Sequence, residues 1–379
     1  MTASTTAGRT RRSALLRGVS ASGQLFQVLR NPNFRRLWLT SLVGTVTMWT
    51  IQVANGYVAF TLTGSALALG SIALAQAIPQ VLLAPVGGVL ADRFDKRWLV
   101  LVGQFLISVS SLLVGVLLVS GQLQFWHLVA AALIQGIGFP IYLPANLGWM
   151  PTIARRDELQ NALALQNLGI NAGRIVGPSI AGALIAVPWF GVTGIYFLRL
   201  ISFAWICWLI SRVTVSGKPD SSAPRRQFAS EIVFGGRYVF GRPALSFLFA
   251  YALVISLLGQ AYQQVLPAFA LAVFGVGSEG LGVMLSVVGV GAVAGSLAVG
   301  AASRMSRKPR LQTVTGVVVG LATITFGLAG WVGQFPLALV ALFAIGLALS
   351  FTITLNNTLV LLNTDRQFYG RVSSLYFIT

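Results

Sequence analysis

The sequence predicts an all-α protein that crosses a membrane many times. Of its 379 residues, 56% are hydrophobic and only 9% are charged. A soluble chain of this length would need far more charge to cover its surface. The apolar residues also form long stretches of roughly 20 residues, the length that an α-helix needs to cross a bilayer.

Ten stretches meet this length, and an eleventh starts near Arg371 and runs to Thr379. We expect the ten spans at residues 37–61, 68–91, 98–120, 126–149, 160–186, 190–211, 245–271, 279–302, 312–331 and 335–360.

The charge is distributed unevenly between the two ends of these spans. The chain has 26 Lys and Arg against 8 Asp and Glu, a net charge of +18. Of the 26 basic residues, 24 lie before the first span or in the connections after even-numbered spans. Cytoplasmic loops of membrane proteins carry such an excess, so the N-terminus is expected in the cytoplasm. This distribution also excludes nucleic-acid binding as the reason for the charge.

The chain is expected to contain two repeated halves. Pro32 and Pro243 precede spans 1 and 7, and Gly88 and Gly300 follow the same spacing (243 − 32 = 211; 300 − 88 = 212). Internal repeats of this size are typical of transporters. Six spans precede the linker and four complete spans follow it. If the second half were as long as the first, the protein would have twelve spans, so we expect that the second half is truncated. The predicted parts are a cytoplasmic segment (1–36), a six-helix half (37–211), a cytoplasmic linker (212–243) and a C-terminal half (244–379).

The N-terminal segment is polar and basic, but it carries a few apolar residues near its end. Leu25, Phe26, Leu29 and Phe34 alternate with Arg30 and Arg35. This pattern predicts a short helix lying on the membrane surface.

Several classes of chemistry are excluded. The single cysteine, Cys207, cannot form an intrachain disulfide, and no cluster of metal ligands occurs. The sequence has no Gly-x-Ser-x-Gly, His-Glu-x-x-His or P-loop motif. We therefore expect no enzyme activity, no catalytic residue, no metal and no cofactor, and no ATP-driven transport by this chain alone.

The turn between spans 2 and 3 concentrates charge at one membrane face. It contains Gly88, Asp92, Arg93, Asp95, Lys96 and Arg97. An Asp at a helix C-terminus is unfavourable unless a cation or another helix N-terminus lies near it. This turn is therefore predicted to act as a conformational latch, although Lys96 and Arg97 alone also fit a basic loop that only fixes topology.

Span 5 contains a second motif, Gly173, Gly177, Pro178 and Gly182. The glycines allow a neighbouring helix to approach closely, and the proline bends its own helix. A hinge that also seals the helix bundle is one interpretation, and ordinary helix packing is the other.

These two motifs resemble motifs A and C of the major facilitator superfamily. Asp95 stands where motif A has Gly, Ala181 departs from motif C, and the second copy of motif A has Arg304 in place of its Asp. The resemblance implies that Asp92 ties span 2 to the N-terminus of span 11 in the outward-open state. Motif B keeps Gln135 and Gly136 but has Ala132 in place of its Arg, which weakens a proton-relay role.

Residues 31–38 and 62–70 are similar to those of macrolide-efflux and enterobactin-exporter-type proteins. The resemblance implies a multi-pass transporter in the inner or plasma membrane of a bacterial-type cell. It would export a small organic molecule by alternating access, as a monomer in contact with membrane lipids. A lipid or lysolipid flippase of the same fold is the alternative, and a lateral opening between the halves would favour it.

Proton coupling is expected from the resemblance, but no acidic residue lies at mid-membrane. The eight acids are Asp92, Asp95, Asp157, Glu158, Asp220, Glu231, Glu279 and Asp365. A proton antiporter usually needs a carboxylate within the membrane. Coupling could use an acid outside this sequence, or Asp92 or Glu279 at a membrane edge, or another mechanism.

Polar residues inside the spans are candidates for a central cavity, because unpaired polar groups are unfavourable in lipid. They are Trp49, Gln52, Asn55, Gln76, Gln135, Arg174, Arg199, Gln260 and Gln263. An Arg at mid-membrane costs roughly 2.5–3.5 kcal/mol on insertion scales, so Arg174 and Arg199 are expected to face the protein interior. Their counter-charge could be an anionic group on the substrate. Backbone carbonyls or lipid headgroups are the alternative.

Overall fold

The computed structural model describes residues 27–155, 158–218, 236–259, 261–302, 308–365, 372 and 376, and these residues are helices joined by short connections. All ten predicted spans are helical and apolar enough to cross a membrane. The N-terminal helices are α2 (Pro32–Thr63), α3 (Ala66–Arg93), α4 (Lys96–Val119), α5 (Phe125–Ile153), α6 (Leu159–Ile185) and α7 (Gly191–Ser211). The C-terminal helices are α9 (Pro243–Gly259), α10 (Tyr262–Ala268), η2 (Phe269–Val273), α11 (Gly277–Ala302), α12 (Lys308–Val332) and α13 (Phe335–Leu362).

The start of α2 corrects the expected place of Phe34, which was assigned to a surface helix. The Asn31 side chain accepts hydrogen bonds from the backbone N–H groups of Asn33 (3.0 Å) and Phe34 (3.4 Å), and Pro32 occupies the first turn. A side-chain cap followed by proline is a strong helix start. Phe34 is therefore part of α2 and is fully buried in the N-terminal core, and a 3₁₀ turn (Val28–Arg30) lies directly before α2. Leu25 and Phe26 lie outside the described residues.

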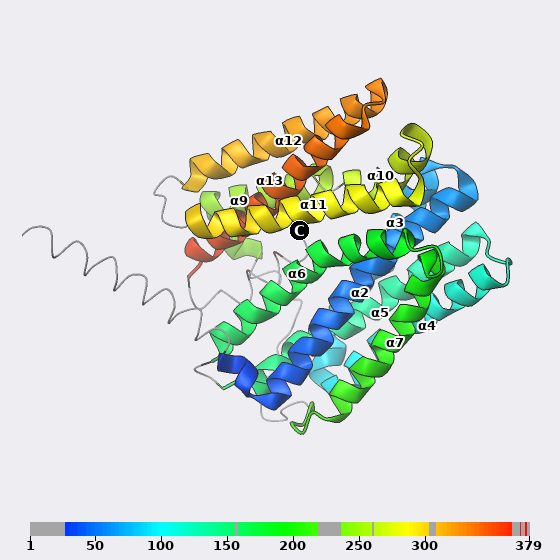
Figure 1. Ribbon diagram of the computed structural model, residues 1–379. Coiled ribbons are helices and arrows are strands. Elements are labelled where there is room, and N and C mark those ends of the chain that lie inside the picture. Colours follow the sequence, from blue (N-terminus) through cyan, green and yellow to red (C-terminus); the bar gives the residue numbers. More distant parts are fainter. Residues whose placement is uncertain are drawn as a thin grey trace, which may run out of the picture.

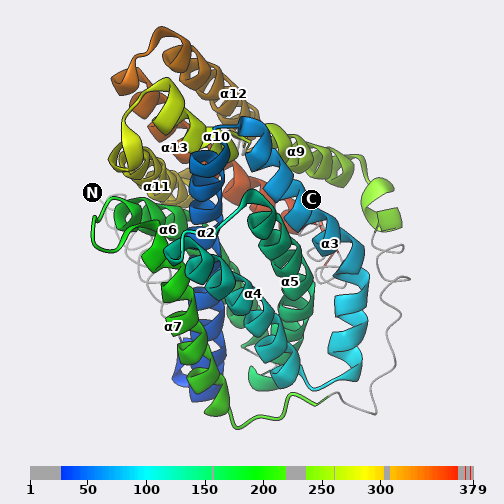
Figure 2. The same cartoon turned by 90° about the vertical axis from the view of Figure 1, so that its right-hand side faces the viewer.

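The helices form two bundles, each with its own core. In the N-terminal bundle, α3 and α4 pack on α5, and α6 and α7 pack on α2. In the C-terminal bundle, α11 and α12 both pack on α13 (Figure 1). Figure 2 shows the two bundles as separate groups of helices, with α6 and α2 of the first lying next to α11 and α10 of the second.

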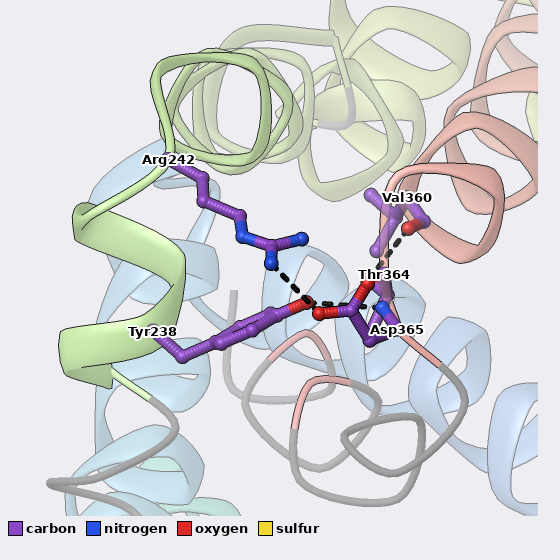
Figure 3. Close-up of polar contacts among 5 residues, drawn as sticks. All are labelled: Tyr238, Arg242, Val360, Thr364 and Asp365. Atoms are coloured by element: carbon purple, nitrogen blue, oxygen red, sulfur yellow. Dashed lines mark hydrogen bonds and ion pairs between the residues drawn. The ribbon is translucent and has the colours of Figure 1, made fainter.

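Equivalent contacts occur at the same end of each bundle. The Asn31 amide donates a 3.0 Å hydrogen bond to the carbonyl oxygen of Ile153. Arg242 forms a 2.7 Å ion pair with Asp365 (Figure 3). Asn31 and Arg242 each precede the proline that starts the first helix of a bundle, and their partners follow or end the fourth helix (242 − 31 = 211; 365 − 153 = 212). The repeat expected from the sequence is therefore present in the tertiary contacts.

The Asp365 carboxylate lies in a small polar cluster at this end of the C-terminal bundle. The Tyr238 hydroxyl accepts a 3.0 Å hydrogen bond from the Asp365 backbone N–H, and the Arg242 guanidinium lies 4.4 Å from the centre of the Tyr238 ring (Figure 3). The hydrogen bond from Arg242, helped by Tyr238, holds the pKa of Asp365 below its ordinary value of 3.8.

The two bundles meet at the end opposite to these contacts. We call the end that carries Asn31, Asp92 and Arg242 the basic end, and the other end, with the turns at Gly64 and Gly275, the far end. Near the far end, the Ser179 hydroxyl lies 3.5 Å from the carbonyl oxygen of Leu285, so α6 runs against α11. Figure 1 shows α6 close to α11 near the far end and diverging from it toward the basic end.

Candidate functional site

A cavity lies where the two bundles face each other. It is lined by Arg174 and Pro178 of α6 and by residues of α10, α11 and α13, namely Tyr262, Gln263, Leu266, Leu285, Val288, Gly289, Ala292, Ser296, Gly346, Leu349, Ser350, Ile353 and Thr354. A smaller pocket adjoins it and shares four lining residues with it, namely Pro178, Gln263, Leu266 and Leu285. The second pocket adds Trp49, Gln52, Val53 and Gly56 of α2, together with Gln264, Pro267 and Leu281.

Four of the predicted cavity residues line these two pockets. They are Trp49, Gln52, Arg174 and Gln263. The Arg174 guanidinium carbon lies 5.4 Å from the centre of the Trp49 ring, a cation–π distance that joins α6 to α2. The cavity wall thus combines one cation, aromatic rings, amides and aliphatic side chains, a composition that suits an organic ligand with a polar group.

The other predicted residues lie elsewhere. The side-chain oxygen of Asn55 accepts a 2.9 Å hydrogen bond from the Tyr196 hydroxyl inside the N-terminal bundle. Gln135 is buried on α5, and the Gln76 backbone packs against Gly136 of that helix. None of the three lines either pocket, and Gln260 lies outside the described residues.

Arg199 lies inside the N-terminal bundle rather than in the cavity. Its side chain is 1% exposed and donates a 2.6 Å hydrogen bond to the Thr47 hydroxyl and another to the Gln104 side-chain oxygen. These neutral oxygens satisfy much of the guanidinium, although its Nε has no partner among the described residues. Sequence reasoning missed Thr47 and Gln104, and the amide of Gln104 within an apolar span was the available signal.

The glycines of motif C serve two different interfaces. A Cβ atom on Gly173 would lie 2.7 Å from the Thr45 methyl group, and one on Gly177 would lie 2.8 Å from the Val46 carbonyl oxygen. Both glycines therefore allow α6 to pack against α2 within one bundle. Gly182 instead faces the other bundle, because its Cβ would lie 2.7 Å from the Cα atom of Gly282 on α11.

Pro178 lies between these two contacts and lines both pockets. Its missing N–H leaves the helix without one internal hydrogen bond at this level. The Thr50 hydroxyl of α2 donates a 3.1 Å hydrogen bond to the adjacent carbonyl of Gly177. The residues of motif C thus contribute to the packing of α6 on α2, to the cavity wall and to the contact between the bundles.

The turn of motif A divides into an exposed part and a bound part. Asp92 and Arg93 end α3 and are exposed at the basic end, and Gly88 is buried. The segment starting at Arg371, which was expected to meet Asp92, lies outside the described residues except for Val372 and Tyr376. Asp95 starts α4, where its carboxylate accepts a 2.9 Å hydrogen bond from the Arg97 backbone N–H.

Residues 212–217, the first part of the linker, are bound to this turn. The Lys96 backbone N–H donates a 2.9 Å hydrogen bond to the carbonyl oxygen of Gly217. The Arg97 guanidinium donates to the Val213 carbonyl oxygen and lies 5.8 Å from the centre of the Trp149 ring. We refer to residues 212–217 as the linker strap.

The start of α2 holds the other end of the linker strap. Arg36 donates a hydrogen bond to the carbonyl oxygen of Arg212. The Asn33 side chain donates a 3.0 Å hydrogen bond to the Thr214 hydroxyl and accepts one of 3.0 Å from the Thr214 backbone N–H. Sequence reasoning did not identify Asn33 and Arg36 as partners of the linker strap, or Gly217 as a partner of motif A, because these contacts span more than a hundred residues.

Comparison with known proteins gives a consistent result. The family model described as transmembrane secretion effector matches residues 24–379. The enterobactin exporter EntS of Citrobacter koseri is 24% identical over 364 residues, covering 91% of this chain and 81% of that protein. The multidrug efflux pump Tap of Mycolicibacterium fortuitum is 27% identical over 326 residues, covering 82% and 76%.

Solved structures with the same fold are also transporters. The nucleoside transporter NupG superimposes with a TM-score of 0.65 at 11% identity, over 91% of this chain and 86% of that one. A bacterial homologue of the iron transporter ferroportin in an inward-facing state gives a TM-score of 0.66 at 15% identity, over 91% and 87%. The chain therefore belongs to the transmembrane secretion effector family of the major facilitator superfamily, and it is a membrane transporter of the exporter type rather than an enzyme.

Proposed function

We propose that the protein exports a small organic molecule from the cytoplasm by alternating access between its two helix bundles. The observation that carries this proposal is the cavity between the bundles, together with bundle contacts concentrated at the far end. A transporter whose bundles are in contact at the far end has its cavity open toward the basic end. The excess of Lys and Arg there supports a cytoplasmic assignment of that end, so the state described is inward-facing.

The exposed position of Asp92 agrees with this state. The latch that motif A is proposed to form would close only when the basic ends of the bundles come together in the outward-facing state. In the inward-facing state, Asp92 would be solvated, and it is exposed in the structure. The Gly182–Gly282 contact would then open as the latch closes, because both belong to one rocking motion.

Export is tested by accumulation assays in bacteria that lack their own efflux pumps. Cells expressing the protein should retain less ethidium or less of a catecholate siderophore than cells with an empty vector. A Gly177→Val variant provides the matched inactive control, because its side chain would collide with the Val46 carbonyl oxygen. Equal retention of all tested compounds in the three strains would contradict the proposal.

We further propose that protons drive export, on the basis of the family resemblance. Among the described acids, Asp92 and Glu279 lie at the two membrane edges and are exposed, so both are candidates for the coupling carboxylate. Flux in proteoliposomes with and without an imposed pH gradient tests the coupling. Equal flux under both conditions would exclude protons as the driving ion.

A lipid or lysolipid flippase remains a second candidate because of one specific feature. A largely apolar cleft lies along the seam between α6 and α11, lined by residues such as Ala183, Val283, Val290 and Phe343. An acyl chain could occupy such a cleft while its headgroup lies near Glu279, which also lines it. Translocation of a fluorescent lysolipid in proteoliposomes, compared with ethidium export, distinguishes the two functions.

A further inference from the structure

Arg174, which is partly exposed, differs from the buried Arg199 in what surrounds it. Arg199 has hydroxyl and amide oxygens as partners within its own bundle. Arg174 lies at the junction of the bundles, on the wall of the cavity between them, and it contacts the ring of Trp49. A ring face attracts a guanidinium but accepts few of its five N–H donors.

The described part of the cavity wall provides no counter-charge for this cation. No Asp or Glu occurs among the described residues that line the cavity or the adjoining pocket. Tyr262 and Gln263 supply a hydroxyl and an amide, and the opposite wall is aliphatic through Leu285, Val288 and Ile353. A cation in such a site strongly favours an anionic ligand, because planar oxyanions accept two parallel N–H bonds from a guanidinium.

We propose that Arg174 binds an oxyanion of the transported molecule, whose apolar or aromatic body lies against the aliphatic wall. The chemical class is therefore an organic acid: a carboxylate or a phosphate attached to a hydrophobic group. This inference rests on the proposed export function for its biological role. The binding itself can be tested without transport.

The test measures ligand binding to the purified full chain in a neutral detergent. The probes are 2-naphthoate and 2-naphthamide, which share a ring system and differ in charge, and binding is followed through the rise in melting temperature. Naphthoate should stabilise the wild-type protein and naphthamide should not. Arg174→Gln should weaken naphthoate binding about 10-fold or more, the effect expected from loss of a charge-assisted pair.

Two further variants control the measurement. Arg174→Lys keeps the charge and should retain part of the naphthoate response. Arg310→Gln removes an exposed cation at the start of α12, away from the cavity, and should behave as wild type. Melting of each variant without ligand shows whether it is folded. If Arg174→Gln is unfolded, Arg174→Lys still tests the proposal.

A third probe, lysophosphatidylglycerol, distinguishes a lipid phosphate from a free organic acid. A response to this lipid that depends on Arg174, without one to naphthoate, would support the oxyanion site and assign it to lipid headgroups. Equal responses to naphthoate and naphthamide, an unchanged naphthoate response in Arg174→Gln, or no response to either anion would overturn the proposal.

Cellular export separates this inference from the proposed function. If carboxyfluorescein and ethidium are both retained as in empty-vector cells, the export proposal fails while the binding result stands. If ethidium export persists in Arg174→Gln while carboxyfluorescein export is lost, both proposals are supported. If Arg174→Gln exports both dyes like the wild type, the oxyanion role of Arg174 fails alone.

Discussion

The backbone N–H of Lys96 donates a 2.9 Å hydrogen bond to the carbonyl oxygen of Gly217. This contact joins the turn of motif A to the first part of the linker. The linker strap is therefore fixed to the N-terminal bundle, and any movement of the motif A turn is transmitted directly to it.

Gly217→Ala should destabilise the protein, because the added Cβ would overlap the Asp95 carboxylate and lie 2.8 Å from the Arg97 backbone nitrogen. Overpacking of this kind costs about 1–3 kcal/mol. Thermal unfolding of the purified protein measures the change. Gly236→Ala is the matched control, since no described residue has an atom within 4 Å of its added Cβ, and equal melting temperatures for both variants would contradict the described contact.

Asp95→Ala should remove the cap of α4 and cost about 1 kcal/mol, whereas Asp95→Asn should change stability little because Asn caps equally well. The usual motif A residue, Gly, should cost only a few tenths of a kcal/mol. The three variants are compared by thermal unfolding. A destabilisation by Asn as large as that by Ala would mean that the charge of Asp95 matters, not its capping bond.

Gly282→Val should reduce export at least tenfold while leaving membrane insertion normal. A side chain at this position would collide with the Gly182 backbone, so the bundles could no longer approach at the far end. Export of a transported dye, normalised to the amount of protein in the membrane, measures the effect. Gly320→Val on α12, where nothing lies within 4 Å, should export normally, and normal export by both variants would show that the close contact is not needed.

Arg199→Ala should destabilise the N-terminal bundle by about 1–3 kcal/mol for each buried neutral partner that loses its hydrogen bond. The change leaves Thr47 and Gln104 without their guanidinium partner and opens a cavity. Unfolding is followed by heat or denaturant, with Arg310→Ala as the exposed control. Wild-type stability of Arg199→Ala would show that water replaces the guanidinium at no cost.

The Asp365–Arg242 pair should make stability depend on pH in the acid range. Its contribution is fully present above pH 3.8, the ordinary pKa of the carboxyl, and is lost as the pH falls through the lowered pKa of the folded state. Both side chains are about half exposed, so the effect should be small. The melting temperatures of wild type and Asp365→Asn should differ at pH 7 and converge near pH 2, and a constant difference would exclude the pair as the cause.

The ten spans were predictable because long apolar stretches and the positions of charged residues report directly on helix length and ends. The start of the first helix was not, since Phe34 lies among arginines and its burial depends on the distant residues of α5 and α6. Hydrophobic patterning gives little help inside a span, because lipid-facing and core-facing positions are both apolar.

The candidate site was only partly predictable, because the sequence does not show which polar residues of a span face the cavity. Gln52 and Asn55 are three residues apart on α2, and only Gln52 faces the pocket between the bundles. Arg174 and Arg199 looked equivalent in sequence, yet one lines the cavity and the other is enclosed by its own bundle. Which face of each helix meets the second bundle is fixed by tertiary packing, and a single sequence does not record it.

The two equivalent contacts at the basic end differ in chemistry, and this has a consequence for the whole molecule. In the first bundle an amide bonds to a backbone carbonyl, whereas in the second two opposite charges meet in solvent. Salt weakens exposed charge pairs but hardly affects neutral hydrogen bonds. A rise in ionic strength should therefore weaken the contact in the second bundle slightly and leave the contact in the first bundle unchanged, so that the two repeated halves differ in their response to salt.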